Sequence, residues 1–302
     1  MSTTSKFTPP MIDGVSASKV FLENDATSNT LYDYLCKKFP HIQSSEWQKR
    51  FLDGLIYAAD GTQLNIKSHY IPNTHIFYYR FLAHEIHVPF QHEILFENDH
   101  LLVVDKPHFL TMTPTGQYVQ ETLLVRLKKQ TAYQDLTPIH RLDRETAGVV
   151  LFCKTPHTRG IYQQLFAERK VQKIYHAIAA YCTQQKFPQL VQLHLEKGQP
   201  FYTMQVNPNK PHNTETWIEQ LEHNQIYAKY LLTPKTGKQH QLRVHLNHLG
   251  LPILNDPFYP VVAHKADDDF NHPLQLLAKE IYFVDPITQQ DMHFSSHLEL
   301  TL

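Results

Sequence analysis

A short segment near the middle of the chain gathers side-chain types that catalysis uses. Residues 140–148 read His-Arg-Leu-Asp-Arg-Glu-Thr-Ala-Gly, with the carboxylate of Asp143 close to two arginines. Pro138 precedes the segment and the apolar run 149–152 follows it, which places Asp143 in a loop that enters a sheet, where polar side chains can reach a cleft. Taken alone, so dense a cluster of charges is more often a solvated loop, so its interpretation depends on the rest of the chain.

A carboxylate in such a loop could act on a glycosidic bond. Glycoside hydrolases use two carboxylates for this work, one of which can activate water. Glu145 follows Asp143 closely, and we interpret it as a partner in a loop salt bridge rather than as a second catalytic acid. A hydrolase of small glycosides is therefore an alternative that lacks a clear acid partner for Asp143.

Metal binding is a second chemistry to consider, because histidines and an aspartate gather in the C-terminal third: His240, His245, His248 and Asp256. On a helix, His245 and His248 would share a face, whereas His240 would lie off it. No acid stands among these histidines in the spacing of metalloproteases. We therefore expect no metal site.

Three further segments accompany the one around Asp143 in a fixed order. Val-Val-Asp-Lys-Pro stands at 103–107, Lys-Ile-Tyr at 173–175, and Thr-Gly-Lys-Gln-His-Gln-Leu-Arg-Val-His-Leu at 236–246. Together the four segments resemble the ordered motifs of the RluA-type RNA pseudouridine synthases. The resemblance covers about residues 88–302 and agrees in order and spacing, which makes it far more specific than a lone short motif.

The resemblance implies a reaction that needs no cofactor. Members of this family convert uridine in RNA to pseudouridine: the bond from the sugar to a ring nitrogen breaks, the uracil turns, and ring carbon five bonds to the sugar. Nothing is oxidised and no group is lost. Water must be kept away from the site, because hydrolysis would release the base.

The same resemblance assigns catalytic roles to three residues. Asp143 would be the single catalytic carboxylate, either as a nucleophile at the anomeric carbon or as a base on a path through a glycal, and the sequence leaves both routes open. Arg243 would keep Asp143 ionised through a forked ion pair. Tyr175 would stack on the uracil, and its hydroxyl could help to remove the proton from ring carbon five.

RNA-binding residues are expected from the same motifs. The target uridine must leave its stack to reach Asp143, and Arg141 would fill the space that it vacates. His140 would contact the flanking backbone. The remaining candidates for contacts to RNA are Arg144, Lys173, Lys106 and His240.

The elements that must position these residues can be outlined from the periodicity of apolar residues. Strands are expected at 94–96, 101–104, 148–152 and 174–180, and helices at 123–127, 158–168 and 239–248, followed by more strands and polar turns. This mixture predicts an α+β fold with a mixed, largely antiparallel sheet in a catalytic domain at 90–302.

A smaller α+β domain is predicted at 16–83, between a tail at 1–15 and a linker at 84–89. Thr30 and Asp33 form a capping-box pattern before one helix, Ser44 or Ser45 could cap a second, and 75–81 reads as an aromatic strand. Two short helices and a hairpin resemble the S-four-like RNA-binding module, with a small structural subdomain as the alternative. The module favours ribosomal RNA over transfer RNA as substrate.

Bulk composition neither demands nor excludes RNA binding. Among 302 residues, 42% are hydrophobic and the net charge is −1, so any contact with RNA must come from a local basic patch. The three cysteines, Cys36, Cys153 and Cys182, fit no disulfide or metal framework, and no apolar run has the length of a signal peptide or membrane span. We expect a cytoplasmic monomer, with a non-catalytic RNA-binding protein of the same fold as the alternative function.

Overall fold

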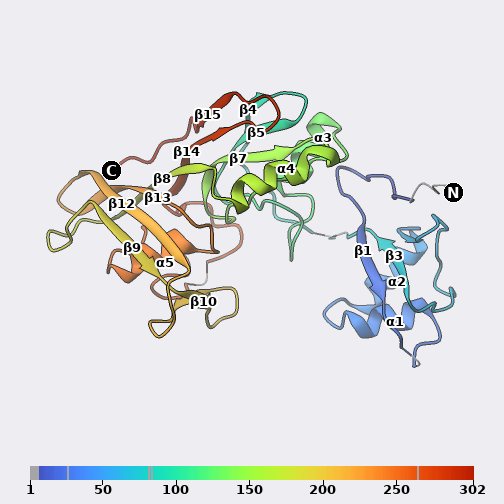
Figure 1. Ribbon diagram of the computed structural model, residues 1–302. Coiled ribbons are helices and arrows are strands. Elements are labelled where there is room, and N and C mark those ends of the chain that lie inside the picture. Colours follow the sequence, from blue (N-terminus) through green and yellow to red (C-terminus); the bar gives the residue numbers. More distant parts are fainter. Residues whose placement is uncertain (1–6, 26, 81, 83, 264) are drawn as a thin grey trace. The chain divides into compact units, whose positions relative to one another are not determined.

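The computed structural model describes residues 7–25, 27–80, 82, 84–263 and 265–302 (Figure 1). The chain divides into two compact units. The smaller one comprises residues 1–85, 116–120 and 125–134, and the larger one comprises 86–115, 121–124 and 135–302. In the described part of the chain, no helix combines the length and apolarity that crossing a membrane would require.

The smaller unit packs two helices on a three-stranded antiparallel sheet with strand order β1-β3-β2. Its elements are β1 (Ser18–Leu22), α1 (Leu31–Lys38), α2 (Ser44–Leu52), β2 (Ile56–Ala58), β3 (Thr74–Tyr78) and most of α3 (Leu123–Thr131). Trp47 and Leu35 lie fully buried at the centre of its main core. The two predicted helices and the aromatic strand are therefore present, although residues 1–6 of the predicted tail and Phe81 lie outside the described residues.

The two helix starts of this unit differ from one another. The capping box before α1 is confirmed: the backbone N–H of Asp33 donates to Thr30 Oγ1 at 3.1 Å, and the N–H of Thr30 donates to Asp33 Oδ2 at 3.3 Å. The predicted serine cap of α2 is wrong. The helix already begins at Ser44, after Gln43, and no side chain caps it, because a serine inside the first turn has passed the position from which its hydroxyl reaches the free N–H groups.

The larger unit is built on a ten-stranded sheet, which confirms the predicted α+β class. The strand order is β4-β5-β7-β14-β8-β13-β12-β9, with β15 on β14 and β6 on β7. All of these pairs are antiparallel except β7 with β14. The strands are β4 (Glu93–Glu97), β5 (Leu101–Lys106), β6 (Thr137–Pro138), β7 (Ala147–Cys153), β8 (Gln172–Ala180), β9 (Gln189–Leu193), β12 (Thr214–His223), β13 (Tyr227–Pro234), β14 (Leu276–Val284) and β15 (Asp291–Ser295).

Two helices and a hairpin complete this unit. Helix α4 (Pro156–Ala167) covers a core that includes Leu151 and Tyr162, and α5 (Gln241–His248) covers a second core with Leu246 and Tyr230. Strands β10 (Leu195–Lys197) and β11 (Met204–Val206) form a separate two-stranded antiparallel sheet, and within the described part of the chain neither pairs with another strand. The helix predicted at 239–248 starts two residues later, because His240 adopts a left-handed conformation.

The centre of the sheet brings the chemically interesting segments together. Strand β7 is buried along its whole length, as expected for its uninterrupted apolar run. Gly148 lies in β7 opposite Ala278 of β14, with a positive φ of 112°. A Cβ atom at this position would lie 2.2 Å from the carbonyl oxygen of Ala278, so only glycine allows the two strands to approach so closely.

We predict that Gly148→Ala destabilises the protein by at least about 2 kcal/mol, because the methyl group must push two backbones apart and the residue must keep an unfavourable φ. Urea unfolding measures the effect. Gly160→Ala is the matched control, because Gly160 lies in α4 and no atom lies within 4 Å of the new Cβ. This substitution should raise the free energy of unfolding by roughly 0.5 kcal/mol. Equal stabilities of the two variants would contradict the predicted close approach.

Candidate active site

Arg243 lies between two carboxylates and connects the turn that follows α5 to the distant loop that carries Asp143. Its Nη1 donates to Asp143 Oδ2 at 3.2 Å, while its Nε and Nη2 donate to the two oxygens of Asp256 at 2.8 Å and 2.6 Å. The exposed fractions of the side chains are 31% for Asp143, 1% for Arg243 and 0% for Asp256. The arginine and one carboxylate are thus buried, and Asp143 is the member of the group that a substrate can reach.

The predicted fork between Arg243 and Asp143 is wrong, because the forked partner of Arg243 is Asp256 and Asp143 accepts from Nη1 alone. Both Asp256 oxygens meet the guanidinium in a fork, and Oδ1 also accepts the backbone N–H groups of Phe258 and Tyr259 at 2.8 Å and 3.1 Å. Burial alone would lower the pKa of Arg243, but the hydrogen bond and charge of Asp256, followed by the charge of Asp143, outweigh burial and raise it. Arg243 therefore stays positively charged beside Asp143.

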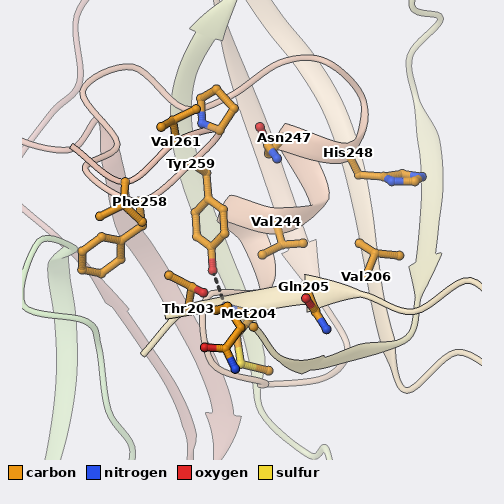
Figure 2. A pocket seen from close by; sticks show the side chains of 14 residues that line it. Thr203, Met204, Gln205, Val206, Val244, Asn247, His248, Phe258, Tyr259 and Val261 are labelled. Atoms are coloured by element: carbon orange, nitrogen blue, oxygen red, sulfur yellow. Dashed lines mark hydrogen bonds between the residues drawn. The ribbon is translucent and has the colours of Figure 1, made fainter. Parts of the chain in front are cut away.

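His240 lies on the other side of Asp143. Its Nε2 is 3.8 Å from Asp143 Oδ2, and its Nδ1 is 2.9 Å from the hydroxyl of Tyr259. That hydroxyl accepts the backbone N–H of Met204 at 2.8 Å (Figure 2), which leaves its own proton for Nδ1 of the histidine. Burial lowers the pKa of His240 to about 4, so a neutral imidazole with its proton on Nε2, facing Asp143, suits these contacts.

Tyr175 reaches the same place from β8. Burial first, and then the charge of Asp143, raise the pKa of its hydroxyl above the ordinary value for tyrosine. The phenol therefore keeps its proton at neutral pH. Asp143, in the loop before β7, and Arg243, in helix α5, were predicted from separate motifs and meet in a hydrogen bond, while Tyr175 on β8 lies near enough for the charge of Asp143 to act on its hydroxyl.

The predicted RNA contact of Lys106 does not fit its position. Its side chain is fully buried, and Nζ donates to the carbonyl oxygens of Pro107, Leu110 and Arg144 at 2.9, 2.9 and 3.1 Å. Burial lowers its pKa to about 7, against the opposing charges of Glu145 and Asp143. Three buried carbonyl groups need a donor, so Lys106 supports the loop that carries Asp143 instead of meeting a phosphate.

His140 and Arg144 are also bound within the protein. His140 stacks on Phe166 at a centroid distance of 4.7 Å, and its Nε2 accepts the backbone N–H of Leu151 at 3.2 Å. Arg144 pairs with Glu145 at 2.7 Å, which confirms the interpretation of Glu145 as a partner in a loop salt bridge. Both side chains shape the loop around Asp143.

Arg141 and Lys173 differ from His140 and Arg144 in how far solvent reaches their side chains. Arg141 is exposed, in keeping with a side chain that can enter an RNA. Lys173 is half-buried beside the loop at Gly237, and burial lowers its pKa. Of the residues predicted to bind RNA, Arg141 is the one whose side chain is open to solvent.

Sequence reasoning missed the structural partners of Arg243 and His240. Asp256 was considered only as a metal ligand, and Tyr259 was not considered. The run Asn-Asp-Pro-Phe-Tyr at 255–259 carried the available signal, since an aspartate before a proline and two aromatics marks a shaped turn. Within the described residues, no three histidine, cysteine or acidic side chains are grouped so that they could hold a metal ion.

We predict that Asp256→Asn lowers the free energy of unfolding by about 3 kcal/mol, because it leaves the buried guanidinium of Arg243 without its forked partner. Urea unfolding is again the measurement. Asp268→Asn, at an exposed site, should change stability by less than about 0.5 kcal/mol. A stable Asp256→Asn protein would mean that Asp143 alone suffices to hold Arg243.

Comparisons with known proteins identify the family of the chain. Residues 100–248 match the family model described as RNA pseudouridylate synthase. The chain is 31% identical over 199 residues to the dual-specificity RNA pseudouridine synthase RluA of Vibrio parahaemolyticus, covering 64% of this chain and 78% of that protein. The Pasteurella multocida protein of the same name is 30% identical over 220 residues, covering 68% of this chain and 92% of the relative.

Other relatives share only part of their length with this chain. Human pseudouridylate synthase RPUSD2 is 36% identical over 176 residues, which cover 56% of this chain but 31% of the human protein. The solved structure of human RNA pseudouridylate synthase domain containing 1 has a TM-score of 0.56 at 23% identity, covering 68% of this chain and 83% of that one, and so supports the fold. By these matches, the chain belongs to the RluA-type family of RNA pseudouridine synthases.

Proposed function

We propose that this protein isomerises uridine to pseudouridine at specific positions of a structured RNA, with Asp143 as the catalytic carboxylate. One observation carries the proposal: Asp143 is the partly exposed member of an otherwise buried group in which Arg243 is held by Asp256. Arg243 donates to Asp143 at 3.2 Å, and such a fixed positive charge suits a carboxylate that must act as an anion in a site closed to water.

Three side chains take part in the reaction. Asp143 either attacks the anomeric carbon of the target uridine or takes a proton from the sugar, and the bond to the ring nitrogen breaks. Arg243 stabilises the carboxylate, and Tyr175 stacks on the uracil while it turns. Ring carbon five then bonds to the sugar, and this step breaks the bond to Asp143 on the first route or returns the proton to the sugar on the second. Carbon five loses its proton and the former glycosidic nitrogen gains one, so that atoms are conserved and no cofactor takes part.

The RNA must present the uridine outside its helical stack. We propose that the exposed Arg141 fills the space left by the flipped base. The smaller unit, with its two helices and short sheet, would serve as an S-four-like module that holds a folded RNA, which favours a ribosomal stem-loop. A relative of 26% identity is named tRNA pseudouridine(32) synthase, mitochondrial, of Saccharomyces cerevisiae, so transfer RNA is the competing substrate.

We propose a monomer that acts in the cytoplasm, because one enzyme surface is sufficient to hold a folded RNA.

The function is tested on total cellular RNA from a strain that lacks the gene. We expect the purified protein to restore pseudouridine at one or a few uridines, with chelator present, and Asp143→Asn to restore none. Mapping the modified sites would also separate ribosomal from transfer RNA. If both proteins bind RNA and neither forms pseudouridine, the chain is a binding module and the catalytic proposal fails.

Tyr175 provides a test of how the proton leaves ring carbon five. Because its hydroxyl keeps its proton at neutral pH, we expect Tyr175→Phe to retain most of the single-turnover rate. Tyr175→Leu, which removes the ring, should lower that rate about tenfold or more through lost stacking. A loss of about 10²-fold or more in Tyr175→Phe would instead identify the hydroxyl as the group that moves the proton.

A further inference from the structure

The turn of the β10–β11 hairpin exposes an aromatic side chain. Phe201 has 77% of its surface accessible, although a phenylalanine in water gains nothing from such exposure. Hydrogen bonds within the turn fix its shape. The backbone N–H of Gly198 donates to the carbonyl of Thr203 at 3.0 Å, and the Thr203 hydroxyl donates to the carbonyl of Pro200 at 2.7 Å. Phe201 is therefore presented by a shaped turn.

A row of aromatic rings connects Phe201 to the candidate active site. The ring centroids of Phe201 and Tyr202 are 5.6 Å apart, those of Tyr202 and Phe258 are 5.3 Å apart, and those of Phe258 and His240 are 5.5 Å apart. His240 in turn lies 3.8 Å from Asp143. We call the three rings Phe201, Tyr202 and Phe258 the aromatic row. It leads from solvent to the catalytic carboxylate.

The row is held in place relative to helix α5. The hydroxyl of Tyr259 accepts the backbone N–H of Met204 in β11 (Figure 2), and Gln239 Nε2 donates to the carbonyl of Tyr202 at 3.3 Å. A cavity of about 390 Å³ lies between the hairpin, α5 and residues 258–262, and Tyr259 forms one of its walls. The hairpin is thus tied to the residues that contact Asp143, and its position can influence them.

Two exposed lysines lie on the segments next to the aromatic row. Lys197, at the end of β10, is exposed, and its Nζ donates to Gln239 Oε1 at 2.7 Å. Lys238, in the loop before α5, is exposed as well. Aromatic faces next to lysines along a path to a reactive centre are what unpaired nucleotides require, because bases stack on rings while phosphates meet cations.

We propose that the aromatic row is a stacking platform for the unpaired bases of RNA next to the target uridine. The proposal rests on the proposed function only for the location of the target at Asp143. Stacking on Phe201 and Tyr202 would hold the flanking nucleotides, and the contact through Phe258 would place the flipped uridine over Asp143. Every base has a stackable face, so the platform would add affinity with little dependence on sequence.

Binding of a short RNA tests the platform without turnover. The probe is a fluorescein-labelled RNA with one uridine flanked on each side by five adenosines, and the protein is the full chain with Asp143→Asn. We expect Phe201→Ala to weaken binding about tenfold, with an unchanged dependence on salt, and Phe201→Trp to bind at least as tightly as the parent. Fluorescence anisotropy at several salt concentrations gives both quantities.

A matched control is available in the same unit. Ile226, in the turn between β12 and β13, is 66% exposed, and Ile226→Ala removes a comparable apolar surface away from the aromatic row. Its affinity for the probe should equal that of the parent. If Phe201→Ala binds as tightly as Ile226→Ala, or if Phe201→Trp binds as weakly as Phe201→Ala, the platform proposal is overturned.

Two other outcomes are distinguishable. If sedimentation shows a dimer for the parent and a monomer for Phe201→Ala, the exposed ring is a contact between copies of the chain and the RNA platform is refuted. The variants with native Asp143 separate this proposal from the proposed function. If Phe201→Ala forms pseudouridine with an unchanged KM, the platform proposal fails and the catalytic proposal stands. If RNA binding depends on Phe201 but the protein forms no pseudouridine, the catalytic proposal fails and the platform proposal stands.

Discussion

A buried guanidinium flanked by two carboxylates is the interaction on which the candidate site depends. Removing an arginine from water costs several kcal/mol, and Asp256 offsets that cost with a forked pair that uses Nε and Nη2. The nitrogen that meets Asp143 is Nη1, which donates to Oδ2. Arg243 therefore contacts Oδ2 of Asp143 and not Oδ1, so the same cation can hold one carboxylate in a fork and leave an oxygen of the other available to a substrate.

The sheet explains how residues so far apart in sequence can meet. Strand β14 lies between β7 and β8, and the chain reaches it last of the three. The loop before β7 carries Asp143, and β8 carries Tyr175, so the central strand fixes the spacing of both. Gly148 allows β7 to approach β14 closely at the point where the loop of Asp143 enters the sheet. The geometry of the site thus depends on the absence of a single Cβ atom.

Residues with a local signature could be predicted from the sequence, and those defined by tertiary partners could not. Asp143, Arg243 and Tyr175 stand in segments whose order and spacing are specific, and the buried run of β7 and the capping box at Thr30 are equally local. Lys106 was predicted to contact RNA, because the carbonyl groups that surround it come together only in the folded chain. Asp256 pairs with α5 across an intervening turn, which no periodicity shows.

The charge balance of the chain limits how it can hold RNA. The net charge is −1, and cations such as Arg144, Lys154 and Lys210 are paired to glutamates at 2.7 Å, so contacts to phosphates must come from local groups such as Lys197 and Lys238. Phosphate contacts alone would give affinity that falls steeply with salt. Stacking on aromatic rings depends far less on charge, and 12% of the residues are aromatic. A platform such as Phe201, Tyr202 and Phe258 is therefore the kind of surface through which a nearly neutral protein can bind an unpaired RNA segment and still position one base with precision.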